Sequence, residues 1–131
     1  MNKIELANEI IQQIKVTDPR ALWAWGATKF QALPECILSA ERTGFGENTG
    51  MRGGLRFKVR GLKFKGWVYV WLTGKDLYDL EAISSRGYQK HYSKDYYCDQ
   101  IMEVIDDLIE RDRGYGLKLQ KKGSKPCSIS V

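Results

Sequence analysis

The sequence predicts an α+β fold with two layers: an antiparallel meander sheet of three or four strands, flanked by an N-terminal and a C-terminal helix. Three observations predict it. Apolar residues recur at helical spacing near both ends, they alternate with polar residues between positions 55 and 82, and turn residues separate the alternating runs. We expect residues 1–120 to form one domain and residues 121–131 to form a flexible basic tail.

The N-terminal helix is predicted from an apolar stripe that runs from Ile4 to Ile14. Asn2 and Glu5 have the spacing of a capping box, in which side chains bind the free amides of the first turn. Thr17-Asp18-Pro19 ends the helix, because the residue before a proline avoids the helical region.

Residues 19–33 fit either a helix or a strand. Pro19 suits the first turn of a helix, whereas the alternation in residues 22–25 suits a strand, and Gly26 interrupts both. Residues 29–33 look extended up to Pro34.

The five glycines of residues 43–54 predict a flexible connection. Gly44-Phe45-Gly46 superficially resembles a nucleotide-binding loop, but such a loop lies between a strand and a helix. Here the third glycine is misplaced and a strand is expected next, so we interpret the segment as a surface loop.

Strict alternation then predicts strands over residues 55–60, 67–72 and 77–82, with a hairpin turn at Thr73-Gly74-Lys75-Asp76. A polar loop is expected over residues 84–94. The last predicted element is a helix from about Asp95 to Arg111.

Composition excludes several classes of protein. The chain has 131 residues, 43% of them apolar, and a net charge of +5, which is typical of a folded soluble domain. No apolar run is long enough to span a bilayer, and neither a signal peptide nor a metal-binding cysteine spacing is recognisable. The three cysteines are an odd, widely spaced set. We therefore expect a cytoplasmic protein with no cofactor and no membrane partner.

The charge is unevenly distributed. Residues 52–75 carry seven basic groups and no acidic ones, whereas residues 95–112 carry seven acidic groups and one basic group. Alternation puts basic and aromatic side chains together on the exposed face of the sheet. Cations suit phosphate contacts, and flat rings suit base stacking. The candidate nucleic-acid-binding residues, for DNA or RNA, are Arg52, Arg56, Lys58, Arg60, Lys63, Lys65, Tyr69 and Trp71.

Two other interpretations stay open. The face can be merely solvated, with Asp79 and Glu81 of the next strand paired with these cations. Alternatively, the predicted acidic helix 95–112 docks a basic protein surface or a second copy of the chain, as a protein–protein or self-assembly module. A titration of the protein with DNA or RNA discriminates between these interpretations and nucleic-acid binding.

Catalysis finds little support. His91 is the only histidine, and Cys98 follows seven positions later without a recognisable third group. We expect a non-enzymatic protein.

Several stretches together resemble a family of small uncharacterised proteins from phages and other bacterial mobile elements. They cover roughly residues 20–110 and are Trp25-Gly26-Ala27-Thr28-Lys29-Phe30, Gly54-Leu55-Arg56-Phe57-Lys58-Val59, Val68-Tyr69-Val70-Trp71-Leu72, Asp76-Leu77-Tyr78-Asp79-Leu80-Glu81, Lys90-His91 and Tyr97-Cys98-Asp99-Gln100-Ile101. The insert at about residues 34–53 and the longer C-terminal tail depart from the family's pattern. The resemblance implies a cytoplasmic accessory protein of a mobile element, and it implies no site residues.

Overall fold

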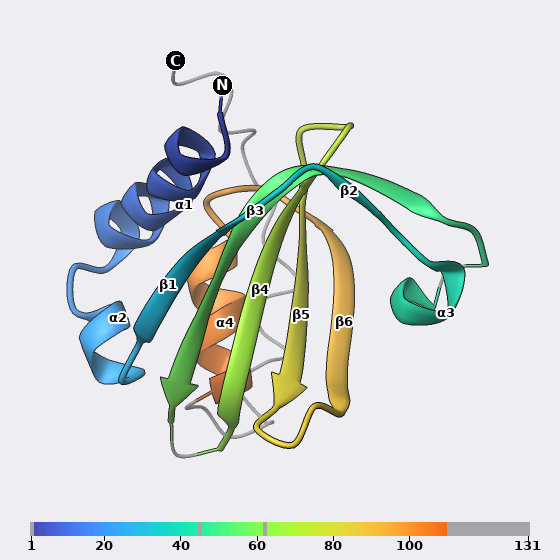
Figure 1. Ribbon diagram of the computed structural model, residues 1–131. Coiled ribbons are helices and arrows are strands. Elements are labelled where there is room, and N and C mark those ends of the chain that lie inside the picture. The colour runs from blue at the N-terminus through green and yellow to red at the C-terminus, as the bar shows by residue number, and fades with distance from the viewer. Residues whose placement is uncertain (1, 45, 62, 110–131) are drawn as a thin grey trace.

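Helices cover one face of an antiparallel sheet, which confirms the predicted α+β class (Figure 1). The computed structural model describes residues 2–44, 46–61 and 63–109. Strand order is β1-β3-β4-β5-β6, and β2 also pairs with β3, so the sheet has more strands than predicted. The strands are β1 (Thr28–Leu33), β2 (Cys36–Leu38), β3 (Thr49–Arg60), β4 (Lys65–Thr73), β5 (Tyr78–Ser84) and β6 (Gln89–Tyr96). The helices are α1 (Lys3–Thr17), α2 (Ala21–Ala24), α3 (Ala40–Thr43) and α4 (Ile101–Ile109).

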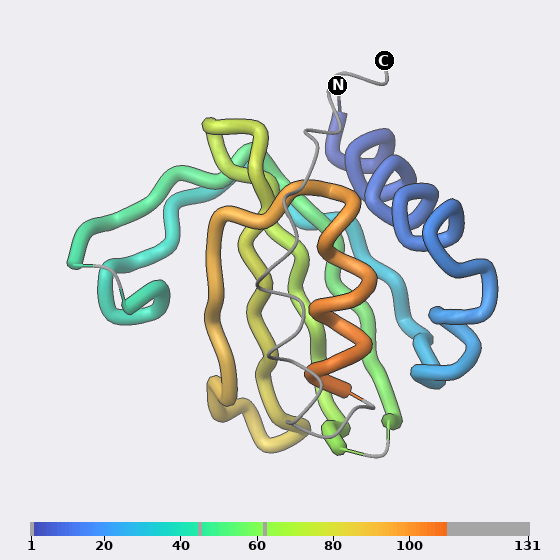
Figure 2. The backbone as a smooth tube through the Cα atoms, turned by 180° about the vertical axis from the view of Figure 1, so that it is seen from behind, coloured from blue at the N-terminus to red at the C-terminus, as the bar shows by residue number. Residues whose placement is uncertain are grey.

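The first helix forms as predicted. The Asn2 side chain accepts a hydrogen bond from the Glu5 backbone nitrogen at 2.8 Å, and Asp18 follows the last helical residue. Leu6, Ala7, Ile10 and Ile14 are its buried residues. Seen from behind, α1 and α4 lie on the same side of the sheet (Figure 2).

Residues 19–33 contain both of the structures that their sequence allows. A single helical turn, α2, precedes β1, and Gly26 joins them with a left-handed φ of 62°. Trp25 at this junction is fully buried, and its Nε1 donates to Asp106 Oδ1 of α4 at 2.9 Å. The contact ties the N-terminal region to the last helix.

The prediction of a flexible connection over residues 43–54 is wrong. β3 begins at Thr49, and α3 begins after Ser39, whose Oγ accepts from the Arg42 backbone nitrogen at 3.2 Å. Together β2, α3 and the start of β3 form a projection that we call the arm (residues 34–44 and 46–50). It extends past the β6 side of the sheet (Figure 1).

A bulge in β3 explains why glycines belong to this strand. Met51 pairs with Thr73 and Gly53 with Leu72, so Arg52 is an extra residue. Gly53 has a φ of 138°, which favours glycine. Gly54 lies so close to β4 that an added Cβ would be 2.1 Å from the Val70 carbonyl oxygen. The glycines therefore allow close strand pairing.

The predicted strands at 55–60 and 67–72 are confirmed within β3 and β4, and the strand predicted at 77–82 is confirmed as β5, which begins one residue later. The turn between β4 and β5 closes with a 2.9 Å hydrogen bond from Thr73 N to the Leu77 carbonyl. The predicted polar loop at 84–94 is wrong, because most of it forms β6, an edge strand paired with β5. Backbone pairing needs no apolar side chains, so the polar composition of these residues does not predict a strand.

The C-terminal helix is confirmed but is shorter at its start than predicted. α4 begins at Ile101, because Asp95 and Tyr96 still belong to β6. Its buried residues are Ile101, Met102, Ile105 and Ile109. The predicted flexible tail, residues 121–131, lies outside the described residues, as do the last acidic residues of segment 95–112.

The sheet buries apolar side chains on both faces. The helix-side core packs alternate residues of β3, β4 and β5 against α1, α2 and α4. A smaller arm-side cluster lies on the opposite face and consists of Leu33, Leu38, Met51 and Trp71, with Cys36, Tyr69 and Tyr92 packed against it. The arm thus covers part of the face that the sequence predicts to be exposed.

Candidate functional site

Strand register brings the predicted cations and rings onto one face. Lys58 pairs with Trp67 and Arg56 with Tyr69, while the next residues along β3 and β4 belong to the helix-side core. Because pairs directly opposite each other point to the same side, these four side chains lie on the face away from α1, α2 and α4. The structure therefore brings together three members of the candidate set, Arg56, Lys58 and Tyr69, and adds Trp67, which that set omits.

Arg56 contacts two aromatic rings and a neighbouring strand on this face. Its guanidinium carbon lies 4.4 Å from the centroid of the Trp67 ring and 5.7 Å from that of Tyr69. Nη1 donates to Tyr69 Oη at 2.9 Å, and Nε donates to Gln31 Oε1 of β1. Such cation–π contacts orient the guanidinium without neutralising its charge. Arg56 and Trp67 together present a stacked, positively charged pair.

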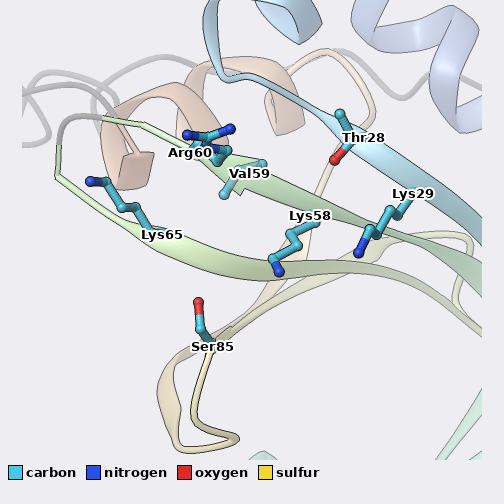
Figure 3. A pocket seen from close by; sticks show the side chains of 7 residues that line it. All are labelled: Thr28, Lys29, Lys58, Val59, Arg60, Lys65 and Ser85. Atoms are coloured by element: carbon cyan, nitrogen blue, oxygen red, sulfur yellow. The ribbon is translucent and has the colours of Figure 1, made fainter.

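A basic groove lies beside this pair, with a volume of about 390 Å³ (Figure 3). Its lining residues come from β1, β3 and β4 and from the turn that follows β5. Four of its lining residues are cations, and none is an acid. The residues that line it are Thr28, Lys29, Lys58, Val59, Arg60, Lys65 and Ser85.

Register explains why the groove forms. Thr28 pairs with Lys58, and Arg60 pairs with Lys65 across the ends of β3 and β4. Lys29 lies at an irregularity in β1 and has a left-handed φ of 56°, which is uncommon for a residue other than glycine. Sequence reasoning missed Lys29, because neither the register nor this conformation is readable from alternation.

Two candidate rings are less available than predicted. Trp71 is only 3% exposed, so its interpretation as an exposed stacking platform is wrong. The arm covers it, and its Nε1 donates to Glu81 Oε1 at 3.2 Å. Tyr69 is partly buried, with the Arg42 guanidinium 5.4 Å from its centroid and Arg56 on the same ring. Trp67 is the remaining partly exposed ring of β4 on this face.

Two candidate cations lie apart from the groove. Arg52 is exposed and forms an ion pair with Asp76 of the turn after β4. Lys63 is exposed in the connection after β3, and its backbone nitrogen donates to the Ile109 carbonyl at 2.7 Å. Neither residue is among those that line the groove.

The acids of β5 do not pair with the cations of the groove among the described residues. Glu81 is fully buried and binds Arg42 of the arm, with Nη2 to Oε1 at 2.7 Å and Nε to Oε2 at 2.8 Å. Gln89 Nε2 donates to the same carboxylate at 2.9 Å. The hydrogen bonds to Glu81 raise the pKa of Arg42. The alternative of Glu81 neutralising Arg56, Lys58 or Arg60 is therefore not realised.

Asp79 has its own partners at the other end of β5. Tyr92 Oη donates to Asp79 Oδ2 at 2.6 Å, and the Asp95 backbone nitrogen donates to Oδ1 at 3.2 Å. Burial raises the pKa of Asp79, and the hydrogen bond from Tyr92 partly opposes this shift. Burial also raises the pKa of Tyr92. The pair joins β5 to β6 beside the arm.

Helix α4, which carries Glu103, Asp106 and Asp107, lies on the same side of the sheet as α1 (Figure 2). Glu103, Asp106 and Asp107 are each partly buried. Asp106 accepts the hydrogen bond from Trp25. The sheet thus separates these carboxylates from the basic groove.

The two residues considered for catalysis occupy different settings. His91 lies in β6, where Nε2 is 2.7 Å from Ser93 Oγ, and burial lowers the pKa of its ring. Cys98 is 2% exposed within the helix-side core. A cysteine nucleophile needs a sulfur atom that a substrate can reach, and Cys98 is buried.

Over residues 2–44, 46–61 and 63–109, no helix combines the length and apolar character needed to cross a membrane. Comparison of the chain with protein-family models, curated proteins and solved structures gives no match.

Proposed function

We propose that the protein is a non-enzymatic nucleic-acid-binding module that uses the basic groove and the adjacent Arg56–Trp67 pair. The observation that carries the proposal is the convergence of four cations on one groove without an acidic lining residue. Lysine and arginine bind the phosphate backbone and release its condensed counterions. The neighbouring indole supplies a flat surface for a base.

The basic groove and the acidic residues of α4 lie on opposite faces of the sheet. This separation of charge favours nucleic-acid binding over the alternative in which the acidic residues dock a protein. The described acidic residues of α4 lie on the helix side of the sheet, and Asp106 accepts a hydrogen bond from the Trp25 side chain. Glu81 is neutralised by Arg42, so it does not repel phosphates at the groove. An accessory role in a phage or other mobile element, which the sequence resemblance implies, is compatible with this binding activity and belongs to the proposal.

Salt dependence tests the proposal quantitatively. If Lys29, Lys58, Arg60 and Lys65 each neutralise one phosphate, the slope of log K against log salt is about −2.8 for a single strand and about −3.6 for a duplex. Doubling the salt concentration then weakens binding about seven- to twelvefold. Fluorescence anisotropy with labelled oligonucleotides between low and moderate salt measures this slope.

A charge-matched pair of double variants provides the control. Lys58→Gln with Lys65→Gln removes two groove cations and is expected to reduce the magnitude of the slope by about 1.4 for a single strand. Lys3→Gln with Lys15→Gln removes the same charge from the exposed surface of α1 and is expected to leave the slope almost unchanged. Absence of binding at low salt, or equal losses in both variants, would refute the proposal.

A further inference from the structure

We propose that the ligand of this face is a single-stranded nucleic acid, with backbone phosphates at the cations of the basic groove and an unpaired base on Trp67. The inference rests on the proposed function and adds the class of nucleic acid. It depends on how the groove, the indole and the arm are arranged on one side of the sheet.

The groove and the indole are direct neighbours. Trp67 pairs with the groove residue Lys58 and is two positions from Lys65 on the same strand. Strand geometry puts positions i and i+2 about 6.6 Å apart on one face. When a phosphate lies at Lys58 and Lys65, the base of the same or the next nucleotide can therefore reach the Trp67 ring.

Only an unpaired base can make that contact. In a duplex, the faces of the bases are stacked on one another inside the helix, and proteins reach their edges through the grooves. A single strand exposes the faces of its bases, which stack readily on aromatic side chains and on arginine planes. Arg56 already lies over Trp67 at 4.4 Å, so a base would extend an existing stack.

The arm confines the ligand to this part of the face. Trp71 is buried beneath it, and Tyr69 contacts both Arg42 and Arg56. Of the three rings that β4 carries on this side, Trp67 is thus the one next to the groove and outside the arm-side cluster. One partly exposed ring beside the groove cations offers a stacking surface to a single unpaired base.

Binding of one labelled 12-nucleotide strand, measured at a single low salt concentration, tests the inference against two controls with the wild-type protein. The first is the blunt duplex of the same sequence, and the second is an abasic strand with the same number of phosphates. We expect the normal strand to bind at least about fivefold more tightly than either, since one stacked base contributes that factor or more. Equal or tighter binding of the duplex, or of the abasic strand, would overturn the inference.

Tryptophan variants locate the base. Trp67→Leu is expected to weaken single-strand binding at least about fivefold and to weaken duplex binding by a smaller factor. Trp23→Leu is the matched control, because Trp23 is 86% exposed on α2 and its loss is expected to have no effect. Equal effects of the two variants contradict the assignment of Trp67. If no nucleic acid binds at all, the proposed function fails, whereas indiscriminate binding refutes only the preference for single strands.

Discussion

Replacing Arg42 by methionine tests whether the arm is anchored through Glu81. The Arg42 guanidinium makes two hydrogen bonds to this carboxylate, at 2.7 and 2.8 Å, and lies over the rings of Tyr69 and Trp71 at 5.4 and 5.6 Å. Methionine retains the aliphatic volume but removes the charge and all the donors. The buried carboxylate would keep only Trp71 and Gln89 as neutral donors.

The magnitude follows from the burial of the two partners. Removing one partner of a fully buried ion pair costs about 3–5 kcal/mol, because the other charge is left without compensation. Glu81 is fully buried, but the Arg42 side chain is 36% exposed, so water can partly replace the guanidinium. We therefore expect Arg42→Met to lower the free energy of unfolding by about 2–4 kcal/mol.

Arg52→Met is the matched control for this variant. Arg52 and Asp76 also form an ion pair, but their side chains are 51% and 66% exposed. Exposed pairs contribute about 0–1 kcal/mol, so this variant is expected to be almost as stable as the wild type. Urea denaturation followed by circular dichroism and tryptophan fluorescence measures both. Equal effects of the two variants, or a loss below about 0.5 kcal/mol for Arg42→Met, would refute the anchoring role.

Two further predictions concern the sheet itself. Gly54→Ala is expected to lower the free energy of unfolding by more than about 2 kcal/mol, because the added Cβ would lie 2.1 Å from the Val70 carbonyl oxygen. Gly50→Ala is the control: its Cβ would meet no atom within 4 Å, so the free energy of unfolding should change by less than about 0.5 kcal/mol in the same urea assay. Burial raises the pKa of Tyr78 to about 12, whereas a tyrosine in the unfolded chain loses its proton near pH 10. Between these values the unfolded chain is deprotonated and the folded protein is not, so the free energy of unfolding falls as pH rises from 10 to 12. Tyr78→Phe should remove up to about 2.7 kcal/mol of that alkaline loss, and identical pH profiles of the two proteins would contradict the assignment.

Alternation and capping made much of the sheet and the first helix predictable. The stretches 55–60, 67–72 and 77–82 alternate strictly because their odd or even positions face a single helix-side core. Asn2 and Glu5 are local signals that need no tertiary information. Strand β6 was missed because edge strands can be polar, and the start of β3 because its glycines serve close pairing rather than flexibility.

The candidate site was predictable only in part, for related reasons. A period of two shows that Arg56, Lys58 and Trp67 share a face, and register confirms it. Alternation does not show what covers that face, so it predicts an exposed Trp71, whereas the arm buries this residue. Lys29 joins the groove through an irregular position of β1, which depends on the packing of distant strands.

The bulge in β3 limits which changes of chain length the protein can accept. Met51 belongs to the arm-side cluster, whereas Leu55, four positions later, belongs to the helix-side core. In a regular strand, residues four positions apart point to the same side, so the extra residue Arg52 is what divides them between two faces. Deletion of Arg52 would turn one of these side chains away from its cluster. A residue inserted beside Glu47, outside the paired strands, would leave the alternation intact.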